Sequence, residues 1–559
     1  MFARQSIVRR LQPTHALDGR LTMDDDEKQG PLPKDQEVAA LADQSVPGAS
    51  GPEDTRPTRL APDRTTHQGL PPDQAGDLGP PAMPATPGDT QATTHVLDHV
   101  DAGLRREINN SNLDAVAQSD PNVGPDRHSG EALRDMVQGG TMPVPVDNLD
   151  RELIQVWKST TSGGENEGKV AVTLMRAMNL VVYVENEDQA AAATDTVRRV
   201  VGRHPCRTIM VVNRSGGSVG AVPRTSDTAD DNDLEATLSA HCEIADASGK
   251  HVCCEQVTIS ANSPEALTRV SNLALNLLIT DLPVFLWWAA GAPFNNTTLT
   301  HLEDSIDRLI VDSQTFSDPV AGLLSMARAA DPAARLNDTV RYAPSDFNWQ
   351  RMGGWREATA AVFDAPDLNS SLWRMGSIEL QYAVPAAGGA PNPVQAFLYA
   401  AWLATRLNWE FHSSAPPSGR GAPGNYVLTL RQGMRSIPIV LNAVQSDGTP
   451  GAIASVRLTT NDVNPTTFSI NLAGNNMYVD CVVEREGAET TIRKVRYSAP
   501  DEISLLDREM EQFGHDAIYE EALIMAGTMA WSSLSYSRRA EISAQLATES
   551  RQGSFDPRF

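Results

Sequence analysis

Aromatic residues are scarce in this chain of 559 residues, at 5% of the total. The scarcity is uneven, because no Phe, Trp or Tyr occurs between Phe2 and Trp157, and residues 31–90 hold 12 of the 37 prolines. Such a stretch cannot bury enough apolar surface to offset the entropy lost on ordering the chain, about 1 to 2 kcal/mol per residue. We therefore predict a disordered arm over residues 1–145.

Basic clusters and long apolar runs are also missing. The formal net charge is −25 and Lys and Arg gather nowhere, which argues against a nucleic-acid partner, because phosphate binding needs clustered cations. A membrane partner is disfavoured likewise, and no run of about 18 apolar residues predicts a transmembrane helix. The first residues of the chain are basic, which is the composition of a transit peptide. An equal alternative is that the start codon is misplaced and that translation begins at Met23.

The chain has five cysteines. An odd number in so long a chain fits a reducing compartment better than a disulfide scaffold, so we expect a cytoplasmic protein.

Common catalytic motifs are absent. The sequence contains no phosphate-binding P-loop, no G-x-G-x-x-G after its first predicted strand and no H-E-x-x-H. Residues 216–220 match G-x-S-x-G, but a polar loop follows them where a nucleophile elbow needs a helix. We predict no catalytic residue, no cofactor and no metal.

Apolar periodicity begins near residue 150. Strands predicted at 180–184 and 208–212 flank an Ala-rich helix at 188–201, and further strands and helices alternate up to Arg308–Val311. Alternating strands and helices imply an α/β layered domain with a largely parallel or mixed sheet, which we place at 150–365.

A second pattern follows. Several segments alternate apolar and polar residues, as antiparallel strands solvated on one face do. We predict a C-terminal α+β domain at 371–530 and a polar tail at 531–559.

The densest polar constellation surrounds a predicted hairpin that turns at Ser248-Gly249. With that turn, facing residue numbers sum to 497, and Cys242, Cys253 and His251 share one face, where they could bind zinc or form a redox pair. Buried thiols acting as small hydrophobes are a stronger alternative than metal binding. A redox role, which needs only two thiols, ranks above zinc, and adjacent Cys253 and Cys254 should not pair. The redox candidates are Cys206, Cys242, Cys253 and Cys254.

Trp and Arg residues gather at two places, the composition typical of interface hot spots. The alternative is that these residues pack a helix on its own sheet. Both interpretations can be correct, because one helix can bury one face and offer the other to a partner. The partner-binding candidates are Trp287, Trp288, Trp349, Arg351, Trp355 and Arg356.

Polar residues flank the strand predicted at 308–311. Because open α/β sheets place ligand crevices at the carboxyl ends of their strands, a crevice for a sugar phosphate or nucleotide is one alternative function. The candidate ligand-binding residues are Arg207, Arg308 and Asp312. The alternative is a purely structural role, as a loop cap or an ion pair.

Six strings carry a family resemblance, in order and at similar intervals over about residues 165–365. They are TLMRAMNLVVY, RHPCRTIMVV, HVCCEQVTI, DLPVFLWW, DRLIVDS and NWQRMGGWRE. The chain resembles the glucose-6-phosphate dehydrogenase assembly protein family, OpcA. The string AFLYAAWLATRLNWE is compatible but less distinctive, and the resemblance does not extend to the arm.

The resemblance implies a non-enzymatic partner of glucose-6-phosphate dehydrogenase in the oxidative pentose phosphate pathway. Such a partner promotes the active oligomer of the dehydrogenase or raises its affinity for substrate, and carries no catalytic residues. In photosynthetic members the thiol redox state passes through the partner, which would give Cys206, Cys242, Cys253 or Cys254 a role. A scaffold without effect on the kinetics is a weaker alternative.

Overall fold

The computed structural model describes residues 140–161, 172–215, 233–244, 251–331, 340–385, 390–415, 424–446, 448–473 and 478–549. All of them belong to one compact unit, which extends from Asn110 to Phe559. Residues 1–139 of the predicted arm and the G-x-S-x-G match at 216–220 lie outside the described residues.

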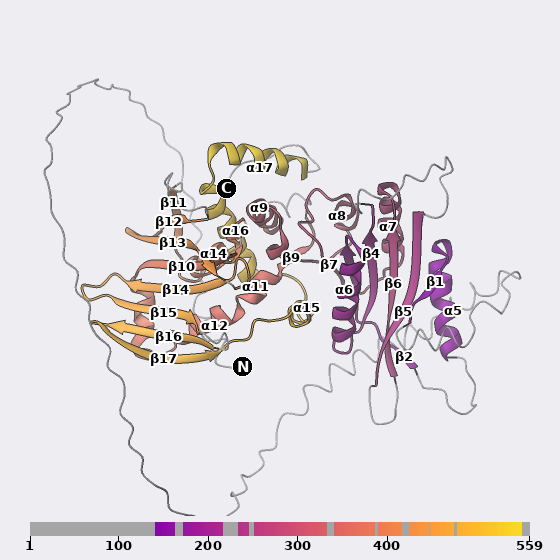
Figure 1. Cartoon of the computed structure of the whole chain (residues 1–559), viewed down its shortest axis with the longest axis horizontal. Helices are drawn as coiled ribbons and strands as arrows, with labels where there is room; N and C mark the ends of the chain where they lie inside the picture. Colours follow the sequence, from indigo (N-terminus) through magenta and orange to yellow (C-terminus); the bar gives the residue numbers. More distant parts are fainter. Residues whose placement is uncertain are drawn as a thin grey trace, which may run out of the picture. The chain divides into compact units, whose positions relative to one another are not determined.

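The first part of the unit forms a nine-stranded mixed sheet (Figure 1). Its order is β1-β5-β6-β4-β3-β7-β8-β9, and β2 pairs with β6 beside this path. The run from β6 to β9 is parallel, whereas β5 is antiparallel to β6 and β1. The predicted α/β domain with a largely parallel or mixed sheet is confirmed. The strands are β1 (Met142–Val144), β2 (Val172–Leu174), β3 (Met178–Val184), β4 (Cys206–Asn213), β5 (Leu234–Ile244), β6 (His251–Ala261), β7 (Val284–Trp288), β8 (Arg308–Val311) and β9 (Ala343–Asp346).

Helices lie on both faces of this sheet, so its central strands are buried on both sides and read as continuous apolar runs. Leu180 and Val182 of β3 pack with α6, while Val181 and Tyr183 belong to the larger core that includes α7. Helix α7 begins as predicted, because the Ser263 side chain accepts a hydrogen bond from the Ala266 amide at 3.1 Å. The helical elements are η2 (Val146–Asn148), α5 (Leu149–Thr161), α6 (Glu187–Val200), α7 (Pro264–Asn276), α8 (Thr297–Leu302), η4 (Ser313–Thr315) and α9 (Pro319–Ala330).

The predicted hairpin of β5 and β6 forms with a different register. Cys242 lies opposite Cys253 and Ile244 opposite His251, so facing numbers sum to two less than predicted, and the predicted register was wrong. Burial of one face specifies strand register strongly, and the observed register brings Cys242 and Cys253 together. Because side chains alternate with a period of two, the shift leaves Cys242 and Cys253 on the shared face that was predicted.

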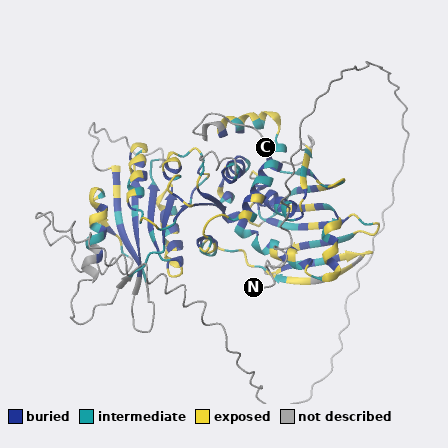
Figure 2. Ribbon diagram, turned by 180° about the vertical axis from the view of Figure 1, so that it is seen from behind, coloured by how far each residue is buried: buried dark blue, intermediate teal, exposed yellow. Residues whose placement is uncertain are grey.

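The second sheet has eight strands in the order β11-β12-β13-β10-β14-β15-β16-β17. Neighbours are antiparallel except β10 and β13. Figure 2 shows long buried stretches in the first sheet and an alternation of buried and exposed residues in the second. The predicted α+β character is confirmed. The strands are β10 (Met375–Pro385), β11 (Glu410–Ala415), β12 (Tyr426–Gln432), β13 (Arg435–Ser446), β14 (Ile453–Thr460), β15 (Thr466–Leu472), β16 (Tyr478–Arg485) and β17 (Ala488–Arg496).

Helices α14 and α12 cover one face of the second sheet, and the last helices return toward the first. Helix α15 packs against α6, and α17 lies within the predicted polar tail, where Ile542 and Leu546 are buried against α9. No described helix is long and apolar enough to cross a bilayer. The remaining helical elements are α11 (Phe347–Arg351), α12 (Gly353–Val362), α13 (Pro366–Asn369), η5 (Ser370–Arg374), α14 (Val394–Arg406), α15 (Glu502–Met510), α16 (Ala517–Ser532) and α17 (Tyr536–Glu549).

Candidate functional site

The strand order of the first sheet reverses direction between β3 and β7. From β3 the chain passes through α6 to β4 on one side, and it later places β7 on the other side. In open α/β sheets the ligand crevice lies at such a reversal, outside the carboxyl ends of the strands. The ends of β3 and β7 are therefore where an enzyme built on this sheet would hold its cofactor.

Aromatic side chains of the chain itself fill this position. Tyr183 and Trp288 are register partners at the ends of β3 and β7, and their rings stack with centroids 3.8 Å apart and planes 13° apart. The Tyr183 hydroxyl accepts hydrogen bonds from the side-chain amides of Asn213 (2.9 Å) and Asn296 (3.3 Å). Both rings are buried and belong to the larger hydrophobic core of the chain.

The helix that follows β3 carries acids where a phosphate-binding helix would need open amides. Helix α6 is capped by Asn186, whose side chain accepts from the Gln189 amide at 2.9 Å. Glu185 precedes the cap, and Glu187 and Asp188 form the first turn. Acids suit the positive end of the helix dipole, but they repel phosphate. This end of α6 is therefore unsuited to a dinucleotide.

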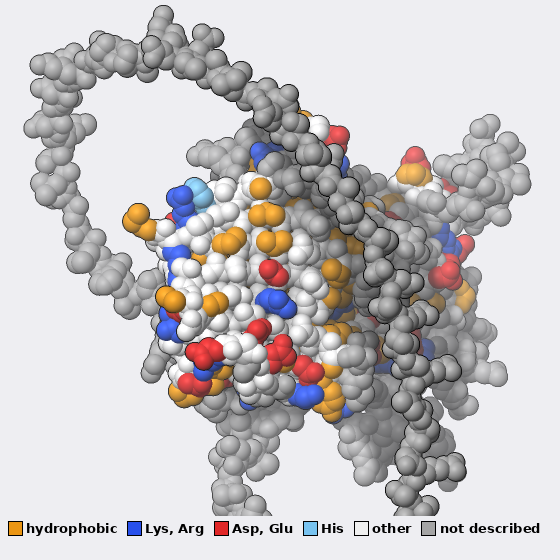
Figure 3. Space-filling view, turned by 60° about the vertical axis from the view of Figure 1, so that its left-hand side comes forward, with side chains coloured by type: hydrophobic (Ala, Val, Ile, Leu, Met, Phe, Trp, Pro, Cys, Tyr) orange, Lys and Arg blue, Asp and Glu red, His pale blue; other side chains and the backbone are white. Residues whose placement is uncertain are grey.

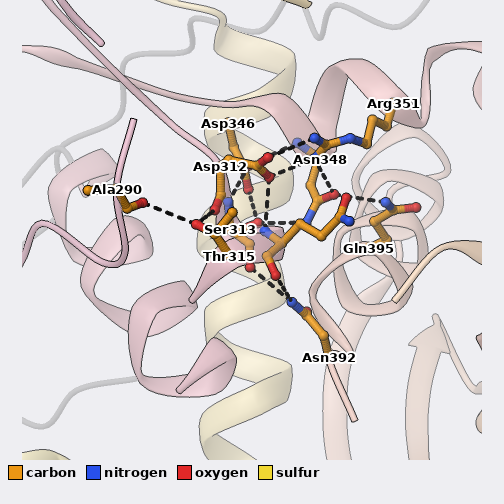
Figure 4. A network of polar contacts seen from close by, with 10 residues as sticks. Ala290, Asp312, Ser313, Thr315, Asp346, Asn348, Arg351, Asn392 and Gln395 are labelled. Atoms are coloured by element: carbon orange, nitrogen blue, oxygen red, sulfur yellow. Dashed lines mark hydrogen bonds and ion pairs between the residues drawn. The ribbon is translucent and has the colours of Figure 1, made fainter. Parts of the chain in front are cut away.

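A second polar cluster lies at the carboxyl ends of β8 and β9 (Figure 4). Asp312, directly after β8, pairs with Arg351 of α11 through two contacts of 2.6 and 2.7 Å. Asp346, the last residue of β9, accepts from the amides of Ser313 (3.1 Å) and Asn348 (2.9 Å) and from the Ser313 hydroxyl. The cluster joins two strand ends to the start of α11.

The same network reaches the second sheet's helix α14. Gln395 of α14 donates to the Asn348 side chain at 2.8 Å, and Asn392 donates to the Ser313 carbonyl at 2.9 Å. Burial raises the pKa of Asp346 to about 6, against a hydrogen bond from Ser313 that favours the ionised form. The carboxyl edge at β8 and β9 is thus a closed joint between the two sheet regions.

Two family models match the chain, and both describe a glucose-6-phosphate dehydrogenase subunit. Residues 197–328 match the model of its N-terminal domain, and residues 342–523 match the model of its C-terminal domain. Together the two matches cover more than half of the chain. The chain belongs to the OpcA family.

Its curated relatives are cyanobacterial. A protein of Nostoc punctiforme, provisionally named OxPP cycle protein OpcA, is 25% identical over 446 residues, which cover 68% of this chain and 92% of the relative. A protein of Synechococcus elongatus with the same provisional name is 27% identical over 350 residues, 60% of this chain and 70% of the relative.

Solved structures resemble the OpcA-family chain only distantly. A 3-ketoreductase from Actinomadura kijaniata aligns at 10% identity with a TM-score of 0.35, covering 64% of this chain and 96% of that one. Glucose-6-phosphate 1-dehydrogenase from Mycobacterium avium aligns at 12% identity with a TM-score of 0.34, covering 63% and 90%. At these TM-scores the likeness does not establish a shared fold or function.

The predicted crevice residues do not form one site in this OpcA-family chain. Arg207 and Arg308 lie at the amino ends of β4 and β8, whereas Asp312 follows the carboxyl end of β8. Because the strands between them are parallel, the two arginines and the aspartate occupy opposite edges of the sheet.

Arg207 takes part in a buried charge cluster instead. The fully buried Glu255 accepts hydrogen bonds from Arg207, from Arg176 (2.8 Å) and from the Trp157 indole (2.6 Å). Burial would raise the pKa of Glu255, but Arg207 and Arg176 outweigh it and lower the pKa. The cluster ties α5 to β4 and β6.

Arg308 anchors the C-terminal helix α15. Its guanidinium contacts Glu509 at 2.8 Å and the Gly514 carbonyl at 2.6 Å, and both charged side chains are buried. A cavity of about 500 Å³ opens beside it, at the amino edge of β7 and β8, rather than at the carboxyl edge. Asp281, Asp307, Arg341 and His515 line this cavity, which gives it both signs of charge.

The four redox candidates separate into a bonded pair and two buried thiols. Cys242 and Cys253 form a disulfide across β5 and β6, with Cα atoms 4.1 Å apart. Cys206 and Cys254 are reduced and buried, and burial raises the pKa of Cys206 to about 12. Because the disulfide uses both thiols, Cys242 and Cys253 cannot ligate zinc in this form. The His251 side chain lies outside the described residues.

The partner-binding candidates are mostly interior. The side chains of Trp287, Trp288, Trp349 and Trp355 are 1 to 3% exposed. Arg356 stacks on Trp349, 3.5 Å from the ring centroid, while Arg351 holds Asp312. The structure therefore places the six residues in the packing of β7, α11 and α12, and only the two arginines retain partial exposure.

Local sequence patterns do not reveal the residues around this aromatic stack. Tyr183, Asn213 and Asn296 come from three separate segments, and only Tyr183, an aromatic residue at the end of an apolar strand, stands out locally. The acids that follow it at positions 185, 187 and 188 were a usable signal.

Proposed function

We propose that this chain is a non-catalytic, cytoplasmic partner of glucose-6-phosphate dehydrogenase that binds the enzyme and activates or assembles it in the oxidative pentose phosphate pathway. Membership of the OpcA family, over both sheet regions, supports the choice of partner. The observation that carries the non-catalytic role is the Tyr183–Trp288 stack, which occupies the cofactor position of an α/β sheet.

Activation sets a thermodynamic requirement. The protein must bind the active state of the dehydrogenase more tightly than the inactive state, by about 1.4 kcal/mol for each tenfold shift in their ratio. Equal affinity for both states would produce a complex without activation.

The chain offers exposed apolar anchors for this contact at one end of the second sheet. Trp373 is 45% exposed, and Met434 and Val463 at the β12–β13 and β14–β15 turns are fully exposed. Hydrogen bonds hold these segments together, from Arg435 to the Trp373 carbonyl (2.8 Å) and from the Asn461 amide to the Arg374 carbonyl (2.7 Å). Exposed Trp and Met beside Arg have the composition of a protein-binding surface.

In this proposal the tryptophan-rich packing supports the contact from behind. Trp349 and Trp355 hold α11 and α12 in place, and Arg351 and Arg356 are the two partner-binding candidates that keep partial exposure. The exposed anchors at the turns are then the primary contact.

Trp373→Ala tests this assignment. Loss of a central aromatic anchor should weaken binding to the dehydrogenase at least about tenfold, measured by titration calorimetry with the purified enzyme. Tyr536→Ala removes another exposed aromatic ring, at the start of α17, and should leave the affinity unchanged. Equal affinities for Trp373→Ala and the unmodified protein would remove this surface from the proposal.

Redox control belongs to the Cys242–Cys253 pair. Cys242 is half-buried, so a thiol reductant can reach it, whereas Cys206 and Cys254 are buried thiols outside the disulfide. Reduction would release the link between β5 and β6 and alter the strands that α5 packs against.

A sugar-phosphate or nucleotide sensor is the alternative function. Its support is the cavity at the amino edge of β7 and β8, whose volume suits a small ligand. Glucose 6-phosphate and NADP in a thermal-shift assay distinguish the two, because a ligand of the folded state raises its stability. A rise with either compound would favour the sensor.

A further inference from the structure

One face of the second sheet has no helix over it among the described residues. Along each strand, residues such as Leu380, Val456 and Phe468 point into the core under α12 and α14, and the residues between them point the other way. We call this second set the open face. Figure 3, which brings the left-hand side of Figure 1 forward, shows mostly white atoms (backbone and uncharged polar side chains) and orange hydrophobic side chains there, with charged side chains mainly toward the edges.

The centre of the open face is almost free of charge. In its four central strands, β13, β10, β14 and β15, the described open-face residues include only two charged ones, Glu379 and Arg457. A solvated sheet face normally carries many charges, and the whole chain has 21% charged residues and a net charge of −25. Depletion of charge is a property of the centre of protein interfaces.

The two charges sit on the midline of the sheet. Strands β10 and β14 are the fourth and fifth of eight, and Glu379 of β10 is the register partner of Arg457 of β14. A two-fold axis that runs along this midline would place each Glu379 against the Arg457 of a second copy. The pair is therefore self-complementary, as an isologous interface requires.

The same axis matches the rest of this row of side chains. Glu379 continues through Val440 to Val427 on one side, and Arg457 continues through Ser469 to Val482 on the other. Rotation about this two-fold axis brings Val427, which is 42% exposed, over Val482 of the second copy, and Val440 over Ser469 of the second copy. Apolar groups then meet apolar or small groups, and opposite charges meet.

The size of the face suits a stable dimer. The eight strands are six to twelve residues long. At about 4.8 Å between strands and about 3.3 Å per residue, a common width of about seven to eight residues gives a face of roughly 34 by 25 Å, or about 850 Å². Stable interfaces bury about 800 Å² per partner. A contact centred on these nearly uncharged strands also avoids the repulsion that two chains of high negative charge would otherwise experience.

We propose that the open face of the second sheet binds the open face of a second copy of this chain, with Glu379 and Arg457 at the two-fold axis. This homodimer does not depend on the dehydrogenase, because it is measured on the purified protein alone. Its failure would leave the proposed function untouched.

The test is sedimentation equilibrium of the full chain across a wide range of concentration. The unmodified protein should be a dimer, and Glu379→Arg or Arg457→Glu should each raise the dimer dissociation constant at least about a hundredfold, because like charges then meet twice. The double exchange E379R/R457E should restore dimerisation to within about tenfold, since both contacts are again between opposite charges. Glu541→Arg on α17 makes the same charge change at an exposed position and should have no effect.

Thermal unfolding of each variant checks that the fold survives. If Glu379→Arg does not fold, Ser469→Arg introduces a charge opposite Val440 and should dissociate the dimer equally. A monomer at every concentration, or a dimer that tolerates both single substitutions, would overturn the proposal. If the protein is monomeric and Glu379→Arg abolishes binding to the dehydrogenase, the face belongs to the enzyme and self-association is excluded.

Discussion

At the scale of single residues, Asp346 makes folding stability depend on pH. Its pKa is raised from 3.8 to about 6 by burial, so between these values the folded protein holds a proton that the unfolded chain has lost. Stability from this group therefore falls as pH rises through the interval, by up to about 3 kcal/mol.

Asp346→Asn should remove that fall. The amide oxygen can still accept from the Ser313 and Asn348 amides, so the local structure should persist. Denaturant unfolding at several pH values should show the unmodified protein losing about 3 kcal/mol relative to the variant between about pH 4 and pH 7. Glu541→Gln, an exposed acid changed to its amide, is the control. A difference between Asp346→Asn and the unmodified protein that does not vary with pH would contradict the assignment.

Residue-level prediction from the sequence succeeded where only the strand period mattered. The alternation of side chains placed Cys242 and Cys253 on one face and Cys254 on the other, and the structure confirms this. It could not find the stack of Tyr183 on Trp288, because that contact depends on β3 and β7 being neighbours although they are far apart in the chain. Arg308 and Asp312 are close in the sequence, which suggested that they form one site. They lie at opposite edges of the sheet, because Arg308 begins the four-residue strand β8 and Asp312 follows its end.

At the scale of elements, the disulfide should stabilise the β5–β6 hairpin. It joins cysteines 11 residues apart, and a bond that closes so short a loop is worth about 2 to 3 kcal/mol in the free energy of unfolding. Denaturant unfolding with and without dithiothreitol should show this loss on reduction. In C242S/C253S the reductant should have no effect, whereas Cys254→Ala should retain the full difference.

The same variants test redox control. If the pair controls activation, dithiothreitol should change the activation of the dehydrogenase by the unmodified protein and by Cys254→Ala, but not by C242S/C253S. An equal effect of dithiothreitol on all three proteins would assign the redox response to the enzyme or to another thiol.

Elements with strong local patterns were predictable from the sequence. The strand at 308–311 matches β8, and the capped start of α7 lies where Ser263 and Pro264 placed it. Strand β9 was not predicted, because Ala343–Asp346 contains no β-branched or aromatic residue. Strand β13 has a weak local signal as well, because Pro438 within it disfavours a strand. Pairing partners compensate for weak local preference in both strands.

At the scale of the whole molecule, the two sheet types followed from the hydrophobic patterns, but their connection did not. Helix α15 comes after the last strand of the second sheet yet packs on α6, and the buried Arg308–Glu509 pair fixes it to β8. Helix α17 returns to α9 in a similar way. These contacts join residues about 200 to 300 positions apart, a range at which local patterns carry no information.

We propose that this chain acts on glucose-6-phosphate dehydrogenase without catalysing a reaction itself. The most direct measurement titrates purified dehydrogenase from the same organism with this protein and follows initial NADPH formation across glucose 6-phosphate concentrations. We expect a saturable fall in the apparent KM or a saturable rise in rate, and no NADPH formation by this protein alone. Unchanged kinetics, with no co-elution of the two proteins on size exclusion, would contradict it.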